Sequence, residues 1–323
     1  MKRRHLLRWA TSGSLVLAVC RPAGAQTTSP RRIGVLAPST AAREAVTLKP
    51  FFDEMERLGW VEGRQVVYDR AFADDRMADL PQRATELVAR RPELIFAPPL
   101  PAAVAARGAT KTIPIVFATA TDPVGAGLVA TPARPGGNAT GIGQFESLAP
   151  KSLQLLREML PKVRRVGLVG TAVDPRFAMD RAALQQLLGS GLQAASAQNP
   201  AELDAALQTL LKSGAEAIFT TSSLLYNQRE RVVELAMAQR VPVVGHRGEM
   251  CDAGALFAYG PSLSAQIEAS ARVVDKILRG ANPAQIPVQQ PTTVELLVNQ
   301  RTAIALGISV PRSILLRAER VIE

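Results

Sequence analysis

The sequence predicts an α/β protein with two Rossmann-like lobes, each a parallel sheet flanked by helices. Three observations predict this fold class. Apolar runs of strand length alternate with stretches of helical spacing, the alternation restarts after residue 145, and the strand-like runs are apolar almost throughout. Strands of that kind are typical of parallel sheets that helices cover on both faces.

The first unit of this pattern occupies residues 31–121. We expect strands at 31–39, 65–73, 93–99 and 113–121, separated by helices at 51–60, 80–91 and 101–110. In the first of these helices, Phe51, Phe52, Met55 and Leu58 fall on one face, as in an amphipathic helix. The order strand–helix–strand is therefore repeated through the whole unit.

The second unit follows residue 145 and has similar length. We expect helices at 148–161, 175–190, 199–214 and 225–240, and strands at 163–170, 215–223 and 241–246. Asn199 and Pro200 mark the start of one helix. A tail completes the chain, with a strand at 255–260, a helix at 262–280, an extended segment at 286–300 and a short helix at 301–308.

The first 25 residues predict an export signal peptide. Basic residues precede an apolar run at 13–19, and the small triplet Ala23-Gly24-Ala25 follows. This layout indicates cleavage after Ala25 and a periplasmic mature protein. Arg3-Arg4 favours a twin-arginine signal, with an ordinary Sec signal as the alternative, and Cys20 offers a lipidation site as a further alternative.

Composition excludes several function classes. The formal charge of +10 falls to +5 once the five basic residues of 1–25 are removed, and no basic stripe interleaved with aromatics remains, so we expect no nucleic-acid partner. Cys251 is the one cysteine after residue 25, which precludes an internal disulfide. A lone His246 with Cys251 predicts neither a metal site nor a catalytic dyad, and no P-loop motif is present. We therefore expect no cofactor and no enzymatic activity.

The candidate site lies where the strands end, because ligands of parallel α/β sheets bind beyond the carboxyl ends of the strands. Polar residues or backbone breakers occupy these ends. The predicted ligand-binding residues are Ser39, Thr40, Pro98, Pro99, Thr121, Asp122, Thr140, Asp174, Ser222, Ser223, Tyr226, Arg247, Glu249 and Tyr259.

Several of these residues have two possible roles. Asp122 either accepts an ammonium group of the ligand or caps the following turn. Ser39 and Thr40 either present hydroxyl groups to the ligand or N-cap the next helix. Tyr226 and Tyr259 either flank an apolar part of the ligand or pack in the wall of the cleft.

The charged pair near residue 248 has similar alternatives. Glu249 binds either a ligand cation or an arginine of the other lobe. Arg247 either pairs with Glu249 or holds a ligand carboxylate.

Several segments resemble the ABC-transporter substrate-binding family, which includes relatives of tryptophan-binding importer components. They are GWVEGRQVVYDRAFADDR, TIPIVFATATDPVGAGLVATPARPGGNATG, GALFAYGPSL and the stretch from ANPAQIPVQQPTTVELL to the last residue. The resemblance covers residues 31–323. It implies a type I periplasmic-binding-protein fold with three crossovers between the lobes. The first lobe would then comprise residues 31–140 and 259–288, and the second 145–256 and 291–323.

The resemblance also implies a function. It is typical of a monomeric periplasmic receptor that captures a small organic solute, an amino acid or a similar compact molecule, aromatic or not, between its lobes. Such a receptor delivers the solute to an ABC permease with its ATPase in the inner membrane. A sensor that feeds a membrane receptor, or an exported enzyme with the same shape, are the alternatives.

Overall fold

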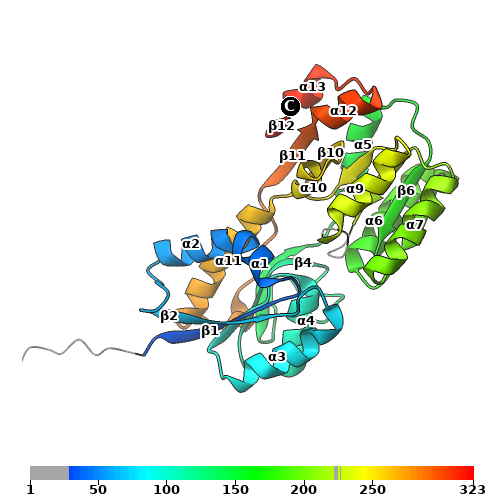
Figure 1. The fold of residues 1–323 in the computed structure, drawn as a ribbon. Coiled ribbons are helices and arrows are strands. Elements are labelled where there is room, and N and C mark those ends of the chain that lie inside the picture. Colours follow the sequence, from blue (N-terminus) through cyan, green and yellow to red (C-terminus); the bar gives the residue numbers. More distant parts are fainter. Residues whose placement is uncertain (1–28, 222–224, 226) are drawn as a thin grey trace, which may run out of the picture.

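The computed structural model describes residues 29–221, 225 and 227–323, and they form two α/β lobes (Figure 1). The predicted two-lobe α/β architecture is confirmed by two separate sheets, one of five strands and one of seven. The predicted signal peptide, residues 1–25, lies outside the described residues. No helix among the described residues is long and apolar enough to cross a membrane.

The first lobe has a fully parallel sheet in the order β2-β1-β3-β4-β5. Ile33 of β1 lies opposite Tyr68 of β2 and Leu94 of β3, which places the long apolar strand in the middle of the lobe. The strands are β1 (Arg31–Ala37), β2 (Val66–Phe72), β3 (Leu94–Phe96), β4 (Ile115–Thr121) and β5 (Ala139–Gln144).

Helices cover both faces of the first sheet. The helices α2 and α11 pack on one face, where Phe51 and Phe96 stack with ring centroids 4.1 Å apart. The helices α3 and α4 pack on the other face against Leu36, Ile95 and Phe117. The helices of this lobe are α1 (Ala41–Thr47), α2 (Lys49–Arg57), η1 (Met77–Asp79), α3 (Leu80–Ala89), α4 (Leu100–Ala109), α11 (Leu263–Leu278) and η3 (Pro283–Gln285).

The second lobe has a mixed sheet in the order β12-β11-β10-β9-β8-β6-β7. All neighbouring pairs are parallel except β10 and β11, which are antiparallel. The strands are β6 (Val166–Gly170), β7 (Leu192–Ser196), β8 (Ala217–Thr220), β9 (Val243–Gly245), β10 (Phe257–Pro261), β11 (Val294–Asn299) and β12 (Arg320–Ile322).

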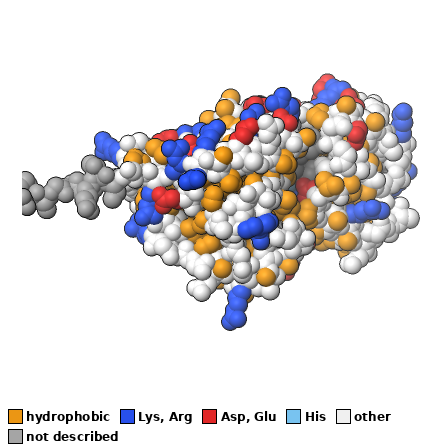
Figure 2. All heavy atoms as spheres, turned by 90° about the horizontal axis from the view of Figure 1, so that it is seen from below, with side chains coloured by type: hydrophobic (Ala, Val, Ile, Leu, Met, Phe, Trp, Pro, Cys, Tyr) orange, Lys and Arg blue, Asp and Glu red, His pale blue; other side chains and the backbone are white. Residues whose placement is uncertain are grey.

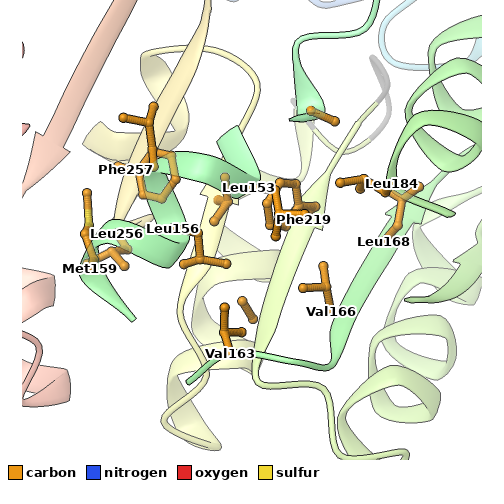
Figure 3. Close-up of a cluster of buried hydrophobic side chains, with 14 of the residues drawn as sticks. Leu153, Leu156, Met159, Val163, Val166, Leu168, Leu184, Phe219, Leu256 and Phe257 are labelled. Atoms are coloured by element: carbon orange, nitrogen blue, oxygen red, sulfur yellow. The ribbon is translucent and has the colours of Figure 1, made fainter. Parts of the chain in front are cut away.

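The core of the second lobe lies on both faces of this sheet. Leu153, Leu156 and Met159 of α5 point toward Phe219 and Phe257 of the strands on one face (Figure 3). The helices α7 and α9 pack on the other face. The helices are α5 (Ala149–Met159), α6 (Pro175–Leu188), η2 (Gly189–Gly191), α7 (Pro200–Lys212), α9 (Arg229–Ala238), α10 (Glu249–Asp252), α12 (Gln300–Leu306) and α13 (Arg312–Leu315).

The chain crosses between the lobes three times. It leaves the first lobe after β5, returns from β10 into α11, and crosses again between η3 and β11. Two of the expected lobe boundaries fall within strands. Residue 140 lies inside β5, which continues the first sheet to Gln144, and residue 259 lies inside β10, which belongs to the second sheet.

The helix α11 is an integral part of the first lobe although it follows the second lobe in sequence. The indole nitrogen of Trp60 donates to Oδ1 of Asp275 at 2.7 Å across 215 positions of the chain. Apolar residues of α11, among them Ile267 and Val274, are fully or almost fully buried against β1, β3 and β4. The first lobe is therefore completed only by this late segment.

Charged side chains are spread over the surface. Figure 2 shows Lys and Arg side chains scattered over the visible face instead of gathered in a stripe. Many described arginines pair with acids close in sequence, such as Arg83 with Glu86 at 3.1 Å and Arg231 with Glu234 at 3.0 Å. Exposed pairs of this kind contribute little stability, about 0–1 kcal/mol each.

Candidate ligand-binding cleft

A cleft with a volume of about 630 Å³ lies between the two lobes. Both lobes contribute the ends of strands and the helices that follow them. From the first lobe the lining residues include Met77, Leu100, Val104, Thr119, Thr121 and Asp122; from the second they include Thr171, Val173, Asp174, Arg176, His246 and Arg247. The cleft therefore lies where the carboxyl ends of the two sheets meet.

Part of the cleft wall is apolar. Val104 of α4 and Val173 of the loop after β6 line it from opposite lobes, with 44% and 81% of their surface exposed. Met77 and Leu100 lie on the same wall of the first lobe. Exposed apolar side chains on two facing walls of a cavity favour a ligand with an apolar part.

Asp122 lines the cleft and also caps the turn that follows it. Its Oδ1 accepts a hydrogen bond from the Gly125 N–H at 2.9 Å, and its backbone has the left-handed φ of +46°. A Cβ atom at Gly125 would approach the carboxylate to 2.1 Å, so a larger residue at this position would have to displace the Asp122 side chain. The capping role is thus present in the structure, and the carboxylate remains on the wall of the cleft.

Arg176 connects the two lobes. It lies in the first turn of α6, and its Nη2 donates to Oγ1 of Thr121 at 3.2 Å and to Oε1 of Gln144. Both acceptors belong to the first lobe. We did not predict Arg176 from the sequence; its position directly after Asp174-Pro175, at the end of β6, was the available signal.

His246 lines the cleft, as Arg176 does. Its Nδ1 lies 3.1 Å from the carbonyl oxygen of Thr220. Burial lowers the pKa of His246 well below its usual range, and the nearby positive charges of Arg247 and Arg176 lower it further. The imidazole is therefore neutral at pH 7 and leaves the positive charge of this region to the arginines.

A smaller cavity of about 50 Å³ adjoins the cleft, with Thr119 and Arg247 in the lining of both. Ser39, Pro98 and Pro99, all predicted from the sequence, line this smaller cavity. Thr40 serves as the N-cap of α1, where its hydroxyl accepts from the Arg43 N–H at 3.4 Å.

Glu44 lies in the smaller cavity and is an unexpected buried acid. Its side chain is 6% exposed, and burial raises the pKa of its carboxyl to about 7. A hydrogen bond from the Ser39 backbone and the charge of Arg43 act in the opposite direction, and the charge of Asp75 raises the pKa further. Sequence reasoning missed this residue, because an acid in the first turn of a helix is ordinarily exposed.

Other predicted residues lie away from the cleft or have structural partners. Thr140 is fully buried, and its hydroxyl donates to the Ile286 carbonyl at 2.7 Å. Glu249 begins α10 and lines a shallow hollow with Asp252 and Arg320 on the second lobe. Tyr259 packs against the core of the second lobe and lines a small cavity together with Arg176 and His246. Ser222, Ser223 and Tyr226 lie outside the described residues.

Four predicted residues, Thr121, Asp122, Asp174 and Arg247, do line the large cleft. Asp174 N-caps α6 by accepting from the Arg176 backbone N–H at 2.9 Å. Among the described residues, no group of acids, histidines and cysteines has the arrangement of a metal site.

Comparison with known families identifies this architecture. The family model described as "ABC transporter substrate binding protein" matches residues 33–322. The chain belongs to this family. Its solved relatives share the two-lobe fold, which confirms the predicted type I periplasmic-binding-protein architecture.

Three relatives of this substrate-binding protein are informative. A tyrosine-binding protein of Clostridioides difficile (strain R20291) is 26% identical over 266 residues, which cover 80% of this chain and 75% of that protein. An ABC domain in complex with L-Trp from Streptococcus pneumonia superposes with a TM-score of 0.85 at 24% identity, covering 91% of this chain and 100% of that one. A conserved domain protein of Vibrio cholerae has a TM-score of 0.82 at 27% identity, covering 90% and 99%. These relatives are similar to the substrate-binding protein over most of its length.

Proposed function

We propose that this substrate-binding protein captures a compact aromatic amino acid between its lobes. The observation that carries the proposal is the 630 Å³ cleft, which combines facing apolar walls with polar strand ends. Its volume falls within the roughly 300–1,000 Å³ that is usual for small-molecule sites. The residues of the cleft thus suit a ligand with one apolar and one charged end.

The relatives support the same ligand class. One is a tyrosine-binding protein and another was solved with L-Trp. Tyrosine and tryptophan share an apolar ring and a zwitterionic head group. Val104 and Val173 offer an apolar surface to such a ring, while Asp122 supplies an acceptor for an ammonium group.

We assign this activity to import. The chain would be exported with cleavage after Ala25, bind its solute in the periplasm as a monomer, and deliver it to an ABC permease and ATPase of the inner membrane. Closure of the lobes around the ligand would present the surface that the permease recognises. The three crossovers are the segments about which the lobes would rotate.

A thermal-shift screen tests the proposal. Because a ligand that binds only the native state raises the melting temperature by mass action, we expect L-tyrosine or L-tryptophan to raise it in a concentration-dependent way. D-Tyrosine and D-tryptophan are the matched controls. A screen in which neither L-amino acid shifts the transition at millimolar concentration would overturn the ligand class. Recovery of unchanged ligand by mass spectrometry would separate binding from turnover.

A further inference from the structure

Arg176 is an arginine of the cleft whose guanidinium has no acidic partner among the described residues. Its two hydrogen bonds go to uncharged oxygens, those of Thr121 and Gln144. Within the described part of the chain, no carboxylate forms an ion pair with its guanidinium, whereas other described arginines, such as Arg43 and Arg272, have one. A half-buried guanidinium without a counter-charge is unfavourable unless an anion joins it.

The Arg176 guanidinium also has hydrogen-bond donors that remain available to a ligand. Both hydrogen bonds leave from Nη2, so the N–H groups on Nε and Nη1 have no acceptor among the described residues. Arg176 lines the large cleft and also a small cavity of about 20 Å³ that His246 lines as well. Its free donors are therefore available where a ligand would lie, and the planar fork of arginine matches a carboxylate.

The neighbouring groups do not supply the missing anion. Asp180 is buried, and its Oδ1 accepts from Oγ of Ser147 at 2.6 Å. Burial raises the pKa of Asp180, and the charge of Arg176 offsets this only in part. Asp174 already accepts the Arg176 backbone N–H, and His246 is neutral.

The start of α6 cannot bind an anion through its backbone in the usual way. Pro175 at the first helical position has no N–H, and the next N–H, that of Arg176, is capped by Asp174. The start of α6 therefore offers side-chain donors, and not main-chain donors, to a ligand in the cleft.

We propose that Arg176 is the carboxylate anchor of the cleft and a determinant of its specificity for ligands that carry a carboxylate next to an apolar group. The inference rests on the proposed function, because it assigns one end of the ligand to one residue. Thr121, the partner of Arg176, directly precedes Asp122 in the chain. The proposed cationic and anionic anchors for a zwitterionic head group thus both line the cleft.

Matched acid and amide probes test this assignment. Titration calorimetry on the mature chain would compare L-tyrosine with L-tyrosinamide, and L-tryptophan with L-tryptophanamide. Arg176→Met should weaken binding of the acids by about 10- to 100-fold, which corresponds to the loss of a charge-assisted hydrogen bond, and change binding of the amides by less than about threefold. Arg176→Lys, which keeps the charge but loses the fork, should fall between.

Arg181→Met is the control, because Arg181 lies exposed on the same helix. It should leave both affinities unchanged. Equal weakening of acids and amides by Arg176→Met, or no weakening of either, would overturn the assignment, and the melting temperatures of the free variants would reveal a merely structural role.

Failure of the aromatic amino acid proposal can be distinguished from failure of the Arg176 assignment. If the wild-type chain binds neither L-tyrosine nor L-tryptophan, the aromatic amino acid proposal is wrong, and the role of Arg176 is decided with 3-phenylpropionate and benzoate against their amides. Selective loss of these carboxylates in Arg176→Met supports the anchor. Failure of the wild type to bind any of the carboxylates refutes it.

Discussion

Asn227 of the second lobe donates a hydrogen bond to Oδ1 of Asp75 in the first lobe, with 3.0 Å between the two atoms. Asp75 has a left-handed φ of +63° and also accepts from Nη1 of Arg43 at 3.3 Å. This contact and the Arg176–Thr121 contact both connect the lobes across the cleft. The arrangement of the lobes therefore depends on a small number of polar contacts that point mutations can address.

Asn227→Asp should favour separation of the lobes. A second carboxylate facing Asp75 replaces a hydrogen bond with repulsion, and Arg43 screens it in part. Exposed interactions of this kind are worth about 1 kcal/mol or less, so the affinity for a bound amino acid should fall by up to about fivefold. X-ray scattering should show a larger radius of gyration. Asn227→Ala is the control with the smaller effect, and identical scattering and affinity in Asn227→Asp would refute a role for this contact.

Asp122→Asn separates the two roles of that carboxylate. Asparagine tolerates a left-handed φ and can still accept from the Gly125 N–H, so the turn should keep its cap and the melting temperature of the free protein should hold. If the carboxylate receives a ligand ammonium, affinity should fall by about 10- to 100-fold. Asp122→Ala loses the cap as well and should cost about 1 kcal/mol of unfolding free energy. If Asp122→Asn kept wild-type affinity, the proposed contact between Asp122 and a ligand ammonium group would be wrong.

Gly141→Ala should strongly destabilise the first lobe. Gly141 of β5 has φ of +152°, and a Cβ atom there would lie 1.9 Å from the carbonyl oxygen of Phe117 on β4. The strand pair must then separate, so the loss should exceed about 2 kcal/mol in urea unfolding. Gly108→Ala is the matched control. It lies in α4, where an added Cβ atom would meet no atom within 4 Å, and it should stabilise the protein by up to about 1 kcal/mol.

Glu44 should make stability fall between pH 5 and 8. Its folded-state pKa of about 7 exceeds the unfolded value of 4.5, so the native state holds a proton that the unfolded chain releases in this range. The stabilisation is fully present below pH 4.5 and is lost as the pH rises through 7, with an upper limit of about 3 kcal/mol. Glu44→Gln should remove this component. Urea unfolding of both proteins at pH 5 and 8 measures the difference, which cancels contributions of other groups such as His246. Parallel pH profiles for the two proteins would contradict the assignment.

Export can be checked by intact-mass analysis of periplasmic protein. We expect a chain that begins at Gln26 or at its cyclised form. Replacement of Arg3-Arg4 by lysines should block export by the twin-arginine route, and unchanged export would indicate the Sec route. A mass that retains residues 1–25, or a lipid on Cys20, would contradict cleavage after Ala25.

The sequence was most informative where local patterning decides the structure. The helix at 51–60 and the strand at 113–121 were predicted because apolar spacing within a few residues determines which face is buried, and α2 and β4 lie there. The strand β7 was missed because it is an edge strand whose residues after Leu192 are largely exposed, so it lacks an apolar pattern. Two glycines in ATGIGQ concealed β5, which is buried along its whole length.

The candidate site was predictable only in part. The carboxyl ends of strands follow from the topology, and Thr121, Asp122, Asp174 and Arg247 were found in this way. Arg176 was not found, because its importance depends on Thr121 and Gln144, which another lobe supplies. Glu249 was expected at the cleft; it begins α10 and lies in the hollow with Asp252 and Arg320 on the second lobe.

The late position of α11 has a consequence for synthesis. A nascent chain that has emerged as far as β5 has all strands of the first sheet, but one face of that sheet has only α2 and lacks the apolar side chains of α11. The helix α11, which carries the Asp275 acceptor for Trp60, is made only after the strands β6 to β10 of the second sheet. Long-range closure of this kind slows folding. The first lobe therefore remains incomplete during most of translation, and a fragment that stops before residue 262 would expose an uncovered apolar face to chaperones and proteases.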